Sequence, residues 1–268
     1  MAKTAAKVFV LALLSIPAGL LPEDAGRAQK ANITAVANQA RARQVLAATI
    51  QALGGDAWLN VRTVREQGKT AAYFQGTPTG VVAETTDTRE LPDELRIDFA
   101  GKGRVVQIYS AQQGWEITYK GAKPVPAEKL QEYLRWRGRS LRVALQQWFP
   151  DPATVLIDEG QALAERHLAD KITLLSPRND AITLEIDAAT HLPIRLSFAW
   201  RDARFHDKNV DAVEYDNYQV VDGMATPFTI TRTRNGQRIS QRFILLVKYN
   251  VAIPTGFFDP ALEAKRKR

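Results

Sequence analysis

Apolar and polar side chains alternate along the stretch from Ala181 to Asn250. In its first two runs the apolar side chains occupy every second position: Ile182, Leu184 and Ile186, then Ile194, Leu196, Phe198 and Trp200. A period of two predicts β-strands that bury one face and expose the other to water. Asp222-Gly223 and Asn235-Gly236 separate later runs, and such short connections are typical of antiparallel hairpins. We therefore expect a β-meander, to which the rest of the chain is added.

Further strands are predicted before this meander. About five lie between Val61 and Lys120, and another runs from Leu163 to Leu175. Together with the meander this makes about eleven antiparallel strands. A single sheet of that size curls, because each strand is twisted against its neighbour by roughly 20–25°.

Two segments have helical patterns instead. The range 32–53 carries one apolar stripe (Val45, Leu46, Thr49, Ile50 and Leu53) and is stopped by Gly54-Gly55. The range 127–149 opens after Pro126 and ends before Pro150, and Gly138 is placed to break it in two. We expect both helices to cover the concave face of the sheet. The predicted fold is mainly β (α+β), a single strongly curved sheet lidded by helices.

The first residues have the features of a targeting segment. Lys3 and Lys7 precede the apolar run from Val8 to Leu21, and Ala28 offers a small residue before a cut at Gln29. The run is too short for a bilayer span of about 20 residues. Residues 1–28 are therefore predicted to be a signal peptide, with an uncleaved anchor as the alternative. The mature protein is expected in the periplasm.

The sequence contains no cysteine. This excludes disulfides, thiolate nucleophiles, thiolate metal sites and a lipidated cysteine after the signal. The net charge is +7, but the basic residues are dispersed through amphipathic strands, which argues against nucleic acid as a partner. Residues 261–268 are expected to be a solvated basic tail. Its alternative role is contact with anionic lipid headgroups, so transient contact with a membrane surface is an open expectation.

Several short motifs then follow one another in a telling order. They are Ala52-Leu53-Gly54-Gly55, Leu91-Pro92-Asp93-Glu94-Leu95-Arg96, Gly114-Trp115, the run Ile186 to Pro193, and Tyr215 to Gly223 with Pro227. In order and spacing this series resembles the bacterial outer-membrane lipoprotein-sorting proteins, the LolA/LolB-like group. The resemblance runs from about residue 45 to 260. Gln112-Gln113 departs from it, because the family often has an acidic residue before Gly-Trp.

The resemblance implies a half-open barrel over residues 29–260, with helices lidding an apolar cavity that binds acyl chains. Candidate cavity residues are the apolar side chains of one strand face: Trp115, Ile117, Tyr119, Leu196, Phe198, Trp200, Phe228 and Ile230. Ordinary core packing is the alternative for each, since burial stabilises such side chains without a ligand. Candidate rim residues for headgroups are Arg96, Arg135, Arg137 and Arg139, with a solvated helix face as the alternative for the last three.

No motif in the sequence indicates catalytic or metal-binding residues. The three histidines share no zinc-binding spacing, and the loop Asp207-x-Asn209-x-Asp211 lacks the glycine and glutamate of a calcium loop. We predict no catalytic residue, metal site or cofactor. The leading interpretation is a soluble, monomeric periplasmic carrier of lipid or of lipoprotein acyl chains. The alternatives are an envelope module that senses stress by binding another protein, and an enzyme on the same scaffold.

Overall fold

The strands join into one antiparallel sheet in the computed structural model, which describes residues 23–101, 105–164 and 166–266. The sheet has thirteen strands in the order β6-β5-β4-β3-β2-β1-β13-β12-β11-β10-β9-β8-β7. Their bounds are β1 Thr63–Phe74, β2 Thr77–Glu90, β3 Glu94–Phe99, β4 Val106–Ser110, β5 Gln113–Thr118, β6 Gly121–Pro124, β7 Val155–Ala164, β8 His167–Leu175, β9 Ala181–Asp187, β10 Pro193–Arg201, β11 Lys208–Val221, β12 Met224–Arg234 and β13 Gln237–Tyr249. The sheet is not closed, since β6 and β7 are its two edges.

Two meanders form the sheet. The first strand in sequence, β1, and the last, β13, pair at its centre. Strands β1 to β6 run outward to one edge, and β7 to β13 run inward from the other. The seam is the antiparallel pair β1–β13, with Val64 opposite Tyr249 and Glu66 opposite Val247. The predicted hairpin turns are confirmed at Asp222-Gly223 and Asn235-Gly236, where all four residues have positive φ.

The expected count of about eleven strands is wrong, because the sheet has thirteen. The two strands that the sequence did not predict are the edge strands β6 and β7. Strand β6 is only four residues long, Gly-Ala-Lys-Pro, which is too short to show alternation. In β7 the register shifts between Asp158 and Gln161, and the irregularity interrupts the period-two pattern. Both strands lie at an edge, where burial imposes little pattern on the side chains.

In the described part of the chain, six helical segments accompany the sheet: α1 Glu23–Leu53, α2 Asp56–Leu59, α3 Ala127–Arg137, α4 Leu141–Val143, the π-helix η1 Ala144–Trp148 and α5 Pro260–Arg266. Helix α1 ends where predicted but begins at Glu23 rather than at residue 32. Residues 1–22 of the expected signal peptide lie outside the described residues. No helix in the described ranges is long and apolar enough to cross a membrane.

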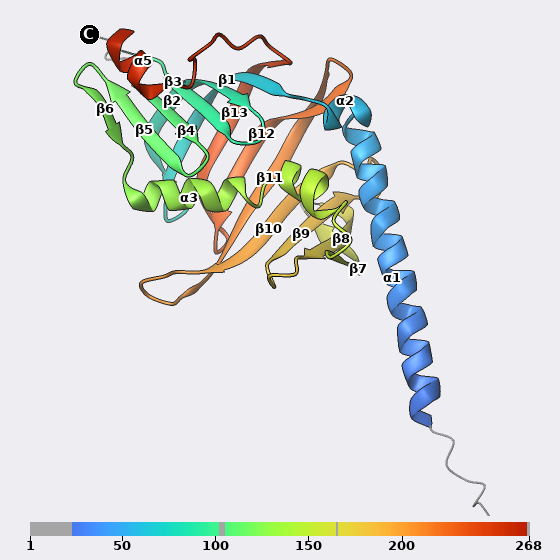
Figure 1. The fold of residues 1–268 in the computed structure, drawn as a ribbon. Helices are drawn as coiled ribbons and strands as arrows, with labels where there is room; N and C mark the ends of the chain where they lie inside the picture. The colour runs from blue at the N-terminus through green and yellow to red at the C-terminus, as the bar shows by residue number, and fades with distance from the viewer. Residues whose placement is uncertain (1–22, 102–104, 165, 267–268) are drawn as a thin grey trace, which may run out of the picture. The chain divides into compact units, whose positions relative to one another are not determined.

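Residues 127–148, called the crossing segment below, carry the chain from the β6 edge to the β7 edge. They comprise α3, α4 and η1, and the predicted break occurs at Gly138, the C-cap of α3. Figure 1 shows α3 lying across the sheet. The sheet face that the crossing segment covers is called the inner face. The main hydrophobic cluster joins Trp136 and Leu145 of the crossing segment to Leu184, Leu196 and other inner-face residues.

The C-terminal part of α1 packs against the same cluster. Its predicted apolar stripe is confirmed, since all five of its residues are buried. Asn38 also pairs with edge strand β7: its side-chain amide donates to the Asp158 carbonyl at 2.6 Å, and its side-chain oxygen accepts from the Asp158 N–H at 2.8 Å. This pairing satisfies backbone groups at an edge that would otherwise be open to another strand.

Helix α5 packs against a different part of the sheet, on β5 and β6. Val106, Ile108 and Ile117 form a separate buried cluster there, with Ala264 of α5 packed against it. The segment expected to be a basic tail from residue 261 is therefore helical up to Arg266, and Glu263 within it is buried.

Candidate functional site

The inner face is apolar on the β7–β11 side. Leu184, Leu196 and Phe198 are buried there beneath the crossing segment. The Trp136 ring meets the Phe198 ring edge-on, with 5.1 Å between ring centroids. Further along α3, Tyr133 stacks on Tyr109 of β4 with centroids 4.1 Å apart. Aromatic pairs of this geometry fix how the crossing segment lies on the sheet.

A small cavity lies between the crossing segment and strands β11 and β12. Its volume is about 140 Å³, and it is lined by Trp136, Arg139, Ser140, Val213, Tyr215, Ile230 and Arg232. We call it the cationic cavity, because its charged lining residues are both arginines. Burial raises the pKa of the Tyr215 hydroxyl, so that group stays a neutral hydrogen-bond donor.

A second, wider cavity, which is open to solvent over much of its extent, lies where the crossing segment meets the ends of α1 and α2. It has a volume of about 480 Å³ and is lined by Ile50, Leu59, Leu145, Gln146, Phe149 and Pro150. We call it the apolar cavity. Its volume lies within the roughly 300–1,000 Å³ typical of small-molecule sites, which are mostly apolar. Gln146 supplies its one polar side chain and donates to the Leu59 carbonyl at 2.8 Å.

The inner face becomes polar at the central seam. Arg89 contacts Glu66 at 2.9 Å, and Arg242 contacts Asp87 at 3.3 Å. Burial acts to raise the pKa of Glu66, but Arg89 and Arg242 together hold it below its ordinary value. Two guanidinium and two carboxylate groups balance one another, so this network is neutral as a whole.

A second ionic cluster holds α3 to β11 and β12. Asp211 is fully buried and accepts from Arg234 at 2.7 and 3.1 Å. Arg234 also donates to Glu132 of α3 at 2.7 Å. Arg135 lies 3.7 Å from Asp211 and covers the Trp200 ring, with its guanidinium carbon 3.5 Å from the ring centroid. One buried carboxylate thus organises two arginines and fixes one flank of the crossing segment.

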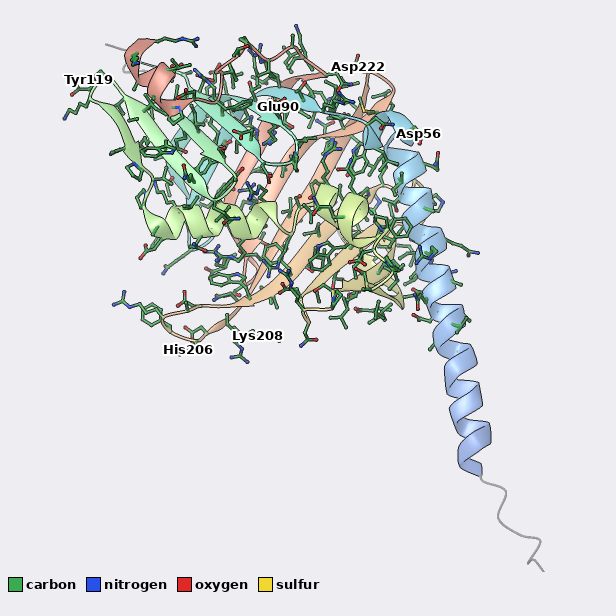
Figure 2. All side chains as sticks on the ribbon, in the orientation of Figure 1. Asp56, Glu90, Tyr119, His206, Lys208 and Asp222 are labelled. Carbon is green, nitrogen blue, oxygen red and sulfur yellow. The ribbon has the colours of Figure 1, made fainter. Side chains whose placement is uncertain are left out.

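The structure brings together five of the eight candidate cavity residues. Leu196, Phe198, Trp200, Phe228 and Ile230 all belong to or pack against the main cluster, and Ile230 lines the cationic cavity. Trp115 and Ile117 lie elsewhere, in the cluster beside α5. Tyr119 is exposed at the turn between β5 and β6, where Figure 2 labels it.

The candidate rim arginines are all engaged with other groups. Arg137 contacts Asp93 at 3.5 Å, and Arg139 contacts Asp180 at 2.8 Å; both partners lie in turns between strands. Arg135 belongs to the Asp211 cluster described above. Arg96 is buried away from the crossing segment and pairs with Asp98 and with Glu263 of α5. The alternative of a solvated helix face does not fit Arg135, Arg137 and Arg139, which tie the crossing segment to the sheet.

Sequence reasoning missed Trp136, Tyr215 and Arg232, three of the lining residues of the cationic cavity. A signal was present for Arg232, because it has the same parity in β12 as Phe228 and Ile230. An arginine on the apolar side of an alternating strand is unusual and indicates a special environment. The described residues contain no group of three histidine, aspartate or glutamate side chains placed to hold a metal ion.

Comparisons with known proteins give the fold. No protein-family model and no curated protein matches the sequence. Among solved structures, a DUF1329 family protein from Desulfovibrio piger superposes with a TM-score of 0.58 at 9% identity, covering 84% of this chain and 98% of that chain. The chain therefore shares the fold of that protein.

Two further solved structures carry the names that the sequence motifs suggested. A putative outer membrane lipoprotein-sorting protein domain from Vibrio parahaemolyticus has a TM-score of 0.49 at 10% identity, covering 77% of this chain and 92% of that chain. A LolA superfamily protein from Nitrosomonas europaea has the same TM-score and identity, covering 80% and 96%. The family that the motifs resemble is thus represented among the structural neighbours.

Proposed function

We propose that the protein is an exported carrier that shelters acyl chains in the apolar cavity, between the crossing segment and the ends of α1 and α2. The observation that carries this proposal is the apolar cavity of about 480 Å³ beside η1, in a chain whose motifs resemble lipoprotein-sorting proteins. Transfer of hydrocarbon from water to such a site is favourable by about 25 cal/mol per Å² of apolar surface. The protein acts by binding and release, without covalent chemistry.

The crossing segment is suited to act as the lid. It is a broken helix, and its last part is a π-helix, a form that often occurs at functional sites. Two ion pairs hold it to turns of the sheet: Arg137 contacts Asp93, and Arg139 contacts Asp180. The side chains of both aspartates are about half exposed. Exposed ion pairs contribute little stability, so they can open and close at small cost.

Export follows from the predicted signal peptide. We propose that residues 1–28 are removed and that the carrier works in the periplasm, where acyl chains need protection from water between two membranes. Intact mass measurement of the exported protein tests this directly. A mass that matches residues 29–268 supports the proposal, and a retained N-terminus contradicts it.

Native mass spectrometry of the exported protein, purified without detergent, tests the carrier function. We expect copurified mass in the lipid range, or its appearance after incubation with membrane vesicles. Leu59→Trp fills the apolar cavity and should reduce the lipid-bound fraction severalfold. Leu245→Trp is the matched control, because it adds the same side chain at an exposed position of β13. A protein that stays free of lipid under both conditions is not a carrier.

A further inference from the structure

The cationic cavity presents hydrogen-bond donors on an apolar background. Its lining residues include two arginines and no carboxylate. Ser140 accepts from the Val143 N–H, so its own hydroxyl hydrogen remains available to a ligand. The Tyr215 hydroxyl, which has a hydrogen bond with the Leu141 backbone, is a further donor.

Arg232 makes no direct ion pair among the residues that the structure describes. Within the described residues no carboxylate lies at ion-pair distance from it, and its contact is with the Trp136 ring, 4.9 Å from guanidinium carbon to centroid. Its side chain is exposed to solvent; the surrounding protein and Arg89 lower its pKa, while Tyr215, Glu132 and Asp87 act to raise it. A cation in such surroundings gains most when an anion is placed against it.

Arg139 faces the same space from the crossing segment. One end of its guanidinium contacts Asp180 at 2.8 Å, while its Nε is buried with no hydrogen-bond partner. Its guanidinium carbon lies 5.4 Å from the Phe198 ring centroid. Arg139 and Arg232 therefore lie on the two members of the Trp136–Phe198 aromatic pair.

Among the described residues, Asp180 pairs with Arg139, and no carboxylate forms a direct ion pair with Arg232. Glu66 and Asp87 are taken up by Arg89 and Arg242 at the central seam. Asp211 and Glu132 are taken up by Arg234. Arg232 is thus the lining arginine whose charge is not taken up by an ion pair among the described residues.

We propose that the cationic cavity binds the anionic head of an amphiphile, a carboxylate or phosphate group attached to an acyl chain, between Arg232 and Arg139. Guanidinium groups suit both anions, because their N–H donors match pairs of carboxylate or phosphate oxygens. A volume of about 140 Å³ accommodates a head group rather than a whole lipid. This inference rests on the proposed carrier function and narrows its ligand to anionic lipophiles.

Competition with a neutral fluorescent probe, N-phenyl-1-naphthylamine, tests the inference on the full mature chain. Hexadecanoate, hexadecyl phosphate and hexadecanol carry the same chain and differ in the head. We expect the two anions to displace the probe at concentrations at least tenfold lower than hexadecanol. In Arg232→Gln and Arg139→Gln this preference should fall to about twofold, while displacement by hexadecanol is unchanged.

Arg201→Gln is the matched control, because it removes the same charge at an exposed position at the end of β10, and it should retain the full preference. Arg232→Lys keeps the positive charge but lacks the paired N–H donors of a guanidinium, so it should retain part of the preference for anions. Inorganic phosphate alone should compete with the anionic amphiphiles and leave hexadecanol unaffected. Thermal unfolding confirms that each variant is folded before it is used.

The outcomes separate the two proposals. Equal displacement by anions and hexadecanol, with no effect of Arg232→Gln, overturns the anionic-head site and leaves the carrier function standing. If the probe binds and no long-chain compound displaces it, the carrier function itself fails, and the head-group site fails with it.

Discussion

The guanidinium carbon of Arg135 lies 3.5 Å from the centroid of the Trp200 ring. The two residues come from α3 and β10, so this contact joins the crossing segment to the far half of the sheet. It is partly desolvated, and cation–π contacts of that kind contribute about 2 kcal/mol.

Arg135→Ala should therefore lower the free energy of unfolding by about 1–2 kcal/mol. Urea denaturation of the mature protein measures this. Arg204→Ala is the matched control, because Arg204 covers Phe205 in an exposed turn, with 5.1 Å from guanidinium carbon to centroid. It should change the unfolding free energy by less than about 0.5 kcal/mol. Equal effects of the two variants would show that Arg135 does not hold the crossing segment.

Replacing Asp211 should be more damaging than removing either of its arginines. Asp211 is fully buried and is the charge that Arg234 and Arg135 share. Asp211→Asn leaves both guanidinium groups without their common partner. We expect a loss near the lower end of the roughly 3–5 kcal/mol seen when a buried pair is broken, because the arginines are partly exposed. Asp216→Asn, at an exposed site on the same strand, should cost under about 1 kcal/mol in the same thermal or urea unfolding experiment.

Glu66 should make stability depend on acid pH. Its pKa is depressed in the folded protein, because Arg89 and Arg242 outweigh the opposing effect of burial. A depressed carboxyl pKa stabilises the fold above the unfolded value of about 4.3, and this stabilisation is lost as pH falls through the folded value. Glu66→Gln should thus lower stability at neutral pH and flatten the decline below about pH 5. Urea midpoints measured at several pH values test this, and an unchanged slope in the variant would refute it.

The contacts of Arg137 and Arg139 with turn carboxylates should control ligand exchange more than stability. Asp93→Asn combined with Asp180→Asn removes both partners, which are about half exposed. We expect stability to change by less than about 1 kcal/mol in total and the release of a bound fluorescent lipid to accelerate severalfold. Glu84→Gln removes an exposed contact with Lys69 on the β1–β2 hairpin and should leave release unchanged. Stopped-flow fluorescence compares the three proteins.

Local patterns predicted those parts of the fold that local interactions determine. The turns at Asp222-Gly223 and Asn235-Gly236, the stripe of α1 and the break at Gly138 are each encoded by a few adjacent residues. In β9 and β10 alternation also placed Leu184, Leu196 and Phe198 on the buried face. It could not say which face the crossing segment covers, because that depends on contacts between residues far apart in the sequence.

Trp115 shows the limit clearly. It lies opposite Ile108 in the β4–β5 pair, and both face the cluster beside α5 rather than the crossing segment. On β12 the sequence did not indicate the role of Arg232. This residue has the same parity as the apolar residues Phe228 and Ile230, but in the sequence it is one polar residue among several. The role of Arg232 depends on Trp136 and Arg139. These two residues lie near it only because the crossing segment passes over β12.

The central seam between β1 and β13 also bears on how the protein is made. Val64 pairs with Tyr249, so the middle of the sheet joins the first strand in sequence to the last. Contacts so distant in sequence close slowly. While the chain emerges from the ribosome or crosses a membrane, β1 and β12 each lack one neighbour until the last strand arrives. The sheet is therefore completed only when β13 has been synthesised, and a chain that lacks this strand presents two further open strand edges to chaperones and proteases.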